Sequence, residues 1–175
     1  MRSGTDRNAG MATTTLGGNP VNTVGELPTV GQPSPHVSLT KADLTELGSD
    51  DLAGKRVVLN IFPSIDTAVC AMSTRKFNEL ASGLDNTMVV CASADLPFAL
   101  TRFCGAEGLD KVVTGSSFRT DFGDAYGVEM ADGRLAGLLA RAVVVLDTDG
   151  TVLYTHLCAA ISDEPDYDGA IAALG

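Results

Sequence analysis

An apolar run, Val57–Phe62, interrupted only by Asn60 and followed at once by Pro63, is the feature that most constrains the fold of this chain. Such a run is typical of a strand buried on both faces of a partly parallel sheet, because a strand with one solvated face would alternate. Pro63 ends the strand because it cannot donate a hydrogen bond to the ladder. From about Thr67 the apolar residues recur at helical spacing, with Cys70 and Phe77 nearly two turns apart. The stretch therefore predicts a strand, a tight turn and a helix, with Cys70 in the first helical turn and facing inward.

This position of Cys70 favours activation of its sulfur. The first-turn amides of a helix have no acceptor within the helix, and the helix dipole adds partial positive charge there. Both favour the thiolate, which is the nucleophilic form of cysteine. Thr67 can accept from these amides and donate toward the sulfur or a bound oxygen, while Pro63 covers one side of the site. On the residues alone two plainer interpretations stay open, namely Cys70 as a small buried hydrophobe and Thr67 as a helix N-cap only.

Length and composition indicate a globular chain without a membrane span. The 175 residues suit one domain, and we expect a flexible extension at residues 1–12 and a single domain at residues 13–175. No apolar run reaches the roughly 18 residues that a membrane helix needs. The net charge of −10 argues against partners such as nucleic acid or an anionic membrane, since both require basic patches. Residues 1–10 lack the apolar segment of a signal peptide, so we expect a cytoplasmic protein.

The four cysteines, Cys70, Cys91, Cys104 and Cys158, do not form a metal or disulfide framework by their spacing. None makes a Cys-x-x-Cys pair and the chain has only 2 histidines, so we expect no structural metal site. The low cysteine density also argues against a disulfide-stapled secreted scaffold. Cys91 falls inside an apolar run and is expected in the core. Cys158 is expected near the surface, either as an adventitious thiol or with a secondary resolving or mixed-disulfide role.

The rest of the chain predicts a sheet with helical crossovers. The apolar run Thr87–Ser93 completes a strand–helix–strand unit, and a helix capped by Asp95 follows it, with Cys104 on its apolar face. An apolar strand over residues 141–147, which Arg141 opens, then turns into an antiparallel partner. The other expected elements are a hairpin of 13–16 and 21–24 with its turn at 17–20, a strand pair of 36–40 and 43–47, a helical turn at 49–54, an edge strand at 111–114, a short helix at 118–126, the antiparallel strand 151–157 and a closing helix at 167–174. This order predicts an α/β chain with a thioredoxin-like fold and extra N-terminal β-hairpins.

The spacing Pro-x-x-x-Thr-x-x-Cys at a strand-to-helix junction resembles the active-site motif of the peroxiredoxins, and Pro63, Thr67 and Cys70 match it position for position. Four further stretches are similar to the bacterial thiol peroxidase subfamily, the atypical two-cysteine peroxiredoxins. They are Ser-Ala-Asp-Leu-Pro-Phe-Ala at 93–99, Arg-Phe-Cys-Gly-Ala-Glu-Gly at 102–108, Ser-Phe-Arg at 117–119 and Gly-Leu-Leu-Ala-Arg at 137–141. The resemblance runs from about Leu16 to Leu174 and implies the peroxiredoxin type of the thioredoxin-like fold.

The resemblance also implies a reaction and a set of roles. Cys70 would attack hydrogen peroxide or an organic hydroperoxide and become a sulfenic acid, while Thr67 and Arg141 position and polarise the peroxide and Pro63 shields the site. Cys104 would resolve the sulfenic acid as an intrachain Cys70–Cys104 disulfide, which thioredoxin then reduces. The family implies no bound cofactor or metal, and its members form homodimers that pack beside the active site.

The residues themselves leave alternatives at three points. A guanidinium suits the charge that develops on a peroxide, because it stays charged and donates in a fork, yet Arg141 could instead reach solvent from the edge of a sheet. Cys104 could be a core residue of a single-cysteine peroxidase, or the whole chain a non-catalytic thioredoxin-like redox sensor. Because a disulfide holds its Cα atoms roughly 4.4–6.8 Å apart, we expect the Cys70 turn, the Cys104 turn or both to unwind on oxidation.

Overall fold

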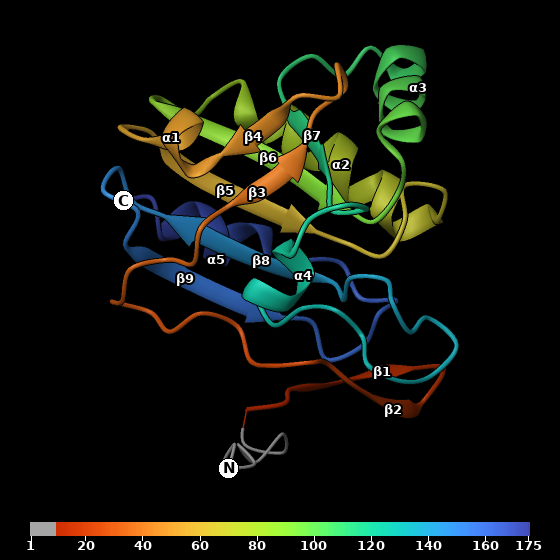
Figure 1. Cartoon of the computed structure of the whole chain (residues 1–175). Helices are drawn as coiled ribbons and strands as arrows, with labels where there is room; N and C mark the ends of the chain where they lie inside the picture. Colours follow the sequence, from red (N-terminus) through yellow and green to blue (C-terminus); the bar gives the residue numbers. More distant parts are fainter. Residues whose placement is uncertain (1–9) are drawn as a thin grey trace.

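The computed structural model describes residues 10–175, so most of the extension expected at residues 1–12 lies outside the described residues. The strands are β1 (Thr13–Leu16), β2 (Asn19–Asn22), β3 (Ser38–Thr40), β4 (Glu46–Gly48), β5 (Arg56–Ile61), β6 (Thr87–Ser93), β7 (Val113–Ser116), β8 (Ala142–Leu146) and β9 (Val152–Leu157). The helices are α1 (Ser49–Leu52), α2 (Ala68–Ala81), α3 (Pro97–Glu107), α4 (Phe122–Ala125) and α5 (Tyr167–Ala172). Figure 1 shows the main sheet crossing the molecule, with the β1–β2 hairpin apart from it.

The main sheet has seven strands in the order β4-β3-β7-β6-β5-β8-β9. Strand β5 lies at its centre, parallel to β6 and antiparallel to β8, so that Val58 stands opposite both Val89 and Val145. Every residue of β5 after Arg56 is buried. The apolar run therefore forms a strand covered on both faces, as its composition predicts.

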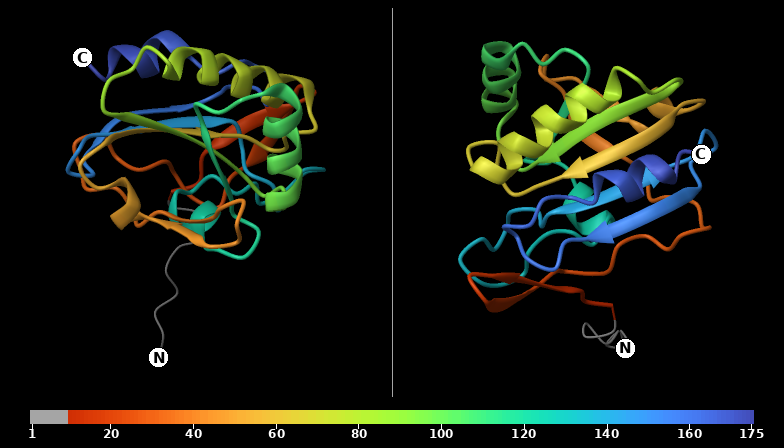
Figure 2. Two further views of the ribbon diagram at one scale, coloured as in Figure 1. Left: turned by 90° about the horizontal axis from the view of Figure 1, so that it is seen from above. Right: turned by 180° about the vertical axis from the view of Figure 1, so that it is seen from behind.

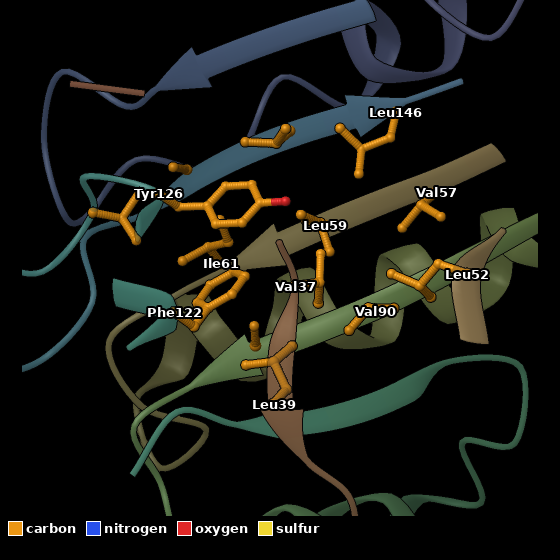
Figure 3. Close-up of a cluster of buried hydrophobic side chains, with 14 of the residues drawn as sticks. Val37, Leu39, Leu52, Val57, Leu59, Ile61, Val90, Phe122, Tyr126 and Leu146 are labelled. Atoms are coloured by element: carbon orange, nitrogen blue, oxygen red, sulfur yellow. The ribbon is translucent and has the colours of Figure 1, made fainter. Parts of the chain in front are cut away.

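Helices cover both faces of this sheet, as the view from above in Figure 2 makes plain. Helices α2 and α5 lie on one face, where Phe77 packs with residues of β5 and β6 in one apolar cluster. The other face carries α1 and α4 and a second cluster, shown in Figure 3, in which Leu59 and Ile61 meet Phe122 and Tyr126. Alternate residues of β5 thus belong to different clusters, because successive side chains of a strand point to opposite faces.

The N-terminal hairpin differs from its expected form in the turn. Gly17 and Gly18 have φ values of 58° and 82°, which suit a two-residue turn of the type that matches strand twist. Asn19 and Pro20 consequently belong to β2 rather than to a four-residue turn. Pro20 is tolerated because both strands of a two-stranded sheet are edge strands.

The β3–β4 hairpin extends the main sheet instead of standing apart from it. Its strand β3 pairs antiparallel with β7, with Thr40 opposite Ser116. The expected edge position of β7 is therefore wrong: this strand lies inside the sheet, between β3 and β6.

The helix expected over residues 118–126 is shorter than predicted. The amide of Thr120 donates to the carbonyl of Ser117 and closes a turn, so that α4 begins only at Phe122 and Phe118 stays 43% exposed. Phe122 and Tyr126 still share a face and stack at 4.6 Å between ring centroids. Among residues 10–175, no helix is long and apolar enough to cross a membrane.

Candidate active site

The junction of β5 and α2 places Cys70 inside the molecule. The amide of Phe62 donates to Ala92 and continues the β5–β6 pairing to the end of the strand, and Pro63 next to it is buried. Thr67 is the N-cap of α2, its carbonyl accepting from the amide of Ala71. Cys70 is then the third residue of the helix and is fully buried. The predicted inward-facing cysteine in a first helical turn is thus present.

Arg141, directly before β8, reaches the sulfur of Cys70 across the sheet. Its Nη2 donates to Cys70 Sγ at 3.1 Å, and its Nε donates to the carbonyl of Ile161 at 2.8 Å. The residue is only 1% exposed, which excludes the alternative in which Arg141 extends to solvent from a sheet edge. Its third nitrogen, Nη1, is buried with no partner among the described residues. A buried donor without a partner costs free energy, so Nη1 is available to an oxygen that enters the site.

The hydroxyl of Thr67 is directed away from the helix amides. It donates to the carbonyl of Ser64 at 2.9 Å, and the N-cap makes no side-chain hydrogen bond to the helix. Thr67 is exposed, whereas Pro63 is buried. The structure thus places both motif residues on the turn that leads to Cys70, but it does not bring the Thr67 hydroxyl onto the sulfur.

Asp95 does not cap α3 as the sequence predicts. The N-cap is Leu96, which has φ −64° and ψ 148°, and Pro97 is the first helical residue. A residue before proline is driven into this extended conformation, which places Asp95 outside the helix. The Asp95 carboxylate binds the Ser64–Ile65 turn instead, a role that the single sequence did not reveal.

Three buried polar side chains, those of Asn60, Ser73 and Thr74, form hydrogen bonds around the first turn of α2. Their role was not predicted from the sequence. The hydroxyls of Ser73 and Thr74 both donate to the carbonyl of Cys70, at 2.9 Å and 3.0 Å. Asn60 Nδ2 donates to Ser73 Oγ at 3.3 Å and weakly to Cys91 Sγ at 3.7 Å. A lone asparagine within the apolar run of β5 was the available signal. Burial raises the pKa of Cys91 to about 12, so this cysteine remains a thiol in the core, as expected.

Cys104 lies on the neighbouring helix α3 and is half-buried. Cys70 and Cys104 are not joined by a disulfide in this structure. Cys104 opens onto a shallow groove of about 460 Å³ that is also lined by Thr101, Leu109 and Thr114. Burial raises the pKa of the Cys104 thiol.

Cys158 follows β9 as predicted but is 1% exposed, which corrects its expected position near the surface. Its amide donates to the carbonyl of Arg141, and its thiol donates weakly to the carbonyl of Glu164 at 3.7 Å. Burial raises the pKa of Cys158 to about 11, although the cation of Arg141 opposes the shift. These contacts turn the Cys158 side chain inward, although most of the following residues, Ala159 and 162–164 among them, are exposed.

Comparison with known proteins agrees with this geometry. Residues 29–171 match the Redoxin family. The chain is 57% identical over 165 residues to a thiol peroxidase of Mycobacterium tuberculosis, an alignment that covers 94% of this chain and 99% of that protein. It is 53% identical over 164 residues to a thiol peroxidase of Corynebacterium glutamicum, with 94% and 99% covered.

Solved structures give the same result for the fold. A peroxiredoxin-like protein from Aquifex aeolicus superposes with a TM-score of 0.86 at 39% identity, over 94% of this chain and 96% of that one. A thiol peroxidase from Chromobacterium violaceum has a TM-score of 0.84 at 21% identity, over 93% and 94% of the two chains.

The chain therefore belongs to the Redoxin family and has the thioredoxin-like fold of the peroxiredoxins, as the resemblance predicts. Within this class it is a thiol-dependent peroxidase of the thiol peroxidase group.

Proposed function

We propose that Cys70 is the thiol that reduces the peroxide and that Arg141 stabilises the reaction. The observation that carries this proposal is the 3.1 Å hydrogen bond from Arg141 Nη2 to Cys70 Sγ in a fully buried site. The Cys70 thiolate attacks one peroxide oxygen, the O–O bond breaks, and the leaving oxygen takes a proton to depart as water or an alcohol. Sulfur is oxidised to a sulfenic acid as the peroxide is reduced. The buried Nη1 of Arg141 is suited to donate to an oxygen on which negative charge develops.

Thr67 and Pro63 complete the proposed site from the side of the turn. Thr67 is exposed and is the N-cap of the helix that carries Cys70, which places its hydroxyl on the turn that leads to the sulfur. Pro63 is buried behind the turn and excludes water from that side. We assign the first a role in orienting the peroxide and the second a shielding role.

Cys104 is the proposed resolving residue. Its thiol attacks the sulfenic acid of Cys70, forms an intrachain disulfide and releases water, and thioredoxin then reduces the disulfide. Cys104 is half-buried, while Cys91 and Cys158 are enclosed in the protein, which favours Cys104 as the partner. Gly108, with φ 67°, ends α3 one turn beyond Cys104, so the helix can unwind from that end. The substrates would be hydrogen peroxide and organic hydroperoxides.

A homodimer and a cytoplasmic location complete the proposal. Leu96, Phe98 and Phe118 are 51%, 65% and 43% exposed, an unusual exposure for large apolar side chains beside a reactive site. A hydrogen bond from Ser116 to the carbonyl of Asp95 joins the two segments that carry them. We assign this surface to a second copy of the chain, and sedimentation velocity of the wild-type protein checks it. The low cysteine density and a thioredoxin reductant fit a reducing compartment.

The test is intact mass and peptide mapping after one equivalent of hydroperoxide is added to the reduced protein. We expect the loss of two hydrogens, mapped to a Cys70–Cys104 disulfide, and sustained peroxide consumption when thioredoxin is present. Cys70→Ser should abolish both, whereas Cys158→Ser serves as the matched control and should preserve both.

Two rivals give different outcomes in the same experiment. A single-cysteine peroxidase would gain one oxygen at Cys70, and its Cys104→Ser variant would still turn over with thioredoxin. A non-catalytic redox sensor would be oxidised once, in stoichiometric amount, without further consumption of peroxide.

A further inference from the structure

Asp95 directs its carboxylate onto the turn that precedes the Cys70 helix. Oδ1 accepts from Ser64 Oγ at 2.7 Å. Oδ2 accepts from the amide of Ile65 at 2.7 Å and from Ser93 Oγ at 2.6 Å. Hydrogen bonds to a carboxylate are short and stronger than those between neutral groups. Two of them hold the turn, and the third, from Ser93, anchors the carboxylate to the end of β6.

The Ser64–Ile65 turn is also hydrogen-bonded to the start of α2. The carbonyl of Ser64 accepts from the Thr67 amide at 3.1 Å and from the Thr67 hydroxyl at 2.9 Å. The side chain of Ile65 is 1% exposed and belongs to the same apolar cluster as Cys70. A displacement of the turn would therefore move the helix start, and Cys70 with it.

Asp95 also ties together the ends of three neighbouring parallel strands. Its side chain holds the turn after β5, and its own position is two residues beyond β6. Its carbonyl accepts from the hydroxyl of Ser116, the last residue of β7. The residue therefore joins the segment that bears Cys70 to the segment that opens α3, which bears Cys104.

We propose that Asp95 is a positioning residue for the peroxidase reaction, holding the Ser64–Ile65 turn so that Cys70 faces the guanidinium of Arg141. This inference rests on the proposed function of Cys70 and Arg141. Asp95 acts through the turn and not on the peroxide. Because reacting groups must be aligned closely, a misplacement of about 1 Å can cost about 100-fold in rate.

The decisive variant is Asp95→Asn, which keeps the size of the side chain but replaces one acceptor oxygen with a donor. Asp168→Asn, at an exposed carboxylate on α5, is the matched control for the loss of one charge. Three quantities are measured for each protein: the single-turnover rate of Cys70 oxidation by hydrogen peroxide, the pH profile of Cys70 alkylation and the melting temperature. We expect the oxidation rate of the Asp95 variant to fall about 10- to 100-fold and its alkylation profile to depart from that of the wild type. The control should match the wild type.

A purely structural role would give a different pattern. The Asp95 variant would then melt at a lower temperature but keep the wild-type oxidation rate and alkylation profile well below that temperature, and the proposal would be wrong. If the variant does not fold, Ser64→Ala removes one of the three bonds to the Asp95 carboxylate and should slow the oxidation of Cys70 about two- to tenfold. An unchanged oxidation rate in that variant would also overturn the proposal.

A wild-type protein that is inert toward peroxide would overturn the proposed function and this inference together. A reactive wild type with equally reactive variants would overturn this inference alone.

Discussion

At the scale of single residues, the guanidinium of Arg141 does two things at once. It donates to the sulfur of Cys70 and to the carbonyl of Ile161, and it does so in an almost fully buried position. A lysine keeps the charge but cannot donate in the same planar fork. For Arg141→Lys we expect the rate of Cys70 oxidation by hydrogen peroxide to fall about 100- to 1000-fold, the effect of losing a preorganised donor. The chain has no tryptophan, so rapid quenching followed by mass spectrometry is the suitable measurement.

The matched control for this change is Arg134→Lys, at an exposed position on the loop that leads to Arg141. It should oxidise at the wild-type rate. An Arg141→Lys protein that folds normally and oxidises within about threefold of wild type would show that donation from the guanidinium fork is not needed.

Residues of the site differ in how far a single sequence could reveal them. Pro63, Thr67 and Cys70 lie within one local motif, where spacing and helix geometry are sufficient to place them. Arg141 follows from the family resemblance, because no local pattern links it to a cysteine 71 positions away. Asp95 was misassigned, since a carboxylate before a helix is usually its cap and its true partners are set by tertiary structure.

At the scale of elements, ion pairs join the helix that carries Cys104 to the segment that carries Cys70. Arg75 on α2 donates from Nε and Nη2 to the carboxylate of Glu107 on α3, each at 3.0 Å. The guanidinium of Arg102 on α3 bonds Asp66, in the turn before α2, at 3.0 Å. These pairs hold the two segments together. We expect them to loosen if Cys70 and Cys104 form the proposed disulfide, because a disulfide restricts how far apart its Cα atoms can lie.

We therefore expect Glu107→Gln to speed the formation of the Cys70–Cys104 disulfide. The side chains of this pair are 48% and 38% exposed, so its removal should lower the barrier modestly and raise the rate about two- to fivefold. Oxidation of Cys70 itself should not change. The two steps are separated by quenching with an alkylating agent after a pulse of peroxide and mapping the products.

Glu79→Gln is the control, because Glu79 is an exposed glutamate on α2. Raised salt should accelerate the wild-type step in the same direction, since it screens exposed charges. A Glu107 variant that forms the disulfide at the wild-type rate or more slowly would mean that the helices need not separate.

Elements with strong local patterns were predictable, and those that depend on neighbours were not. The β5–α2–β6 unit follows from an apolar run and a change of period, both of which are local. The place of β7 inside the sheet depends on β3, a strand that sequence spacing cannot dock. The shortened α4 reflects a turn closed by Ser117 and Thr120, which competes with the helical pattern of the apolar residues.

At the scale of the whole molecule, hydrogen bonds link the N-terminal hairpin to the segment that contacts Arg141. Thr14 Oγ1 donates to the carbonyl of Cys158 at 2.9 Å, and the amide of Ile161 donates to the carbonyl of Thr15 at 2.9 Å. The carbonyl of the same Ile161 accepts from Arg141 Nε. A path of hydrogen bonds therefore runs from β1 through the segment after β9 to the guanidinium that faces Cys70.

Thr14→Val tests this path, because valine has nearly the same shape but cannot donate a hydrogen bond. Thr14 is 1% exposed, so the change leaves a buried carbonyl without its donor and should lower the free energy of unfolding by about 1–3 kcal/mol, measured in urea. If the hairpin also holds Arg141 in place, the oxidation rate of Cys70 should fall several-fold under conditions in which the variant is fully folded.

Thr13→Val is the control for this change. The Thr13 hydroxyl bonds Asn22 at 2.9 Å within the exposed hairpin, and not the segment after β9. A Thr14 variant that loses stability but oxidises Cys70 at the wild-type rate would separate the effect on stability from the effect on the reaction. The hairpin would then stabilise the fold only, and Arg141 would be positioned by β8 and the sheet alone.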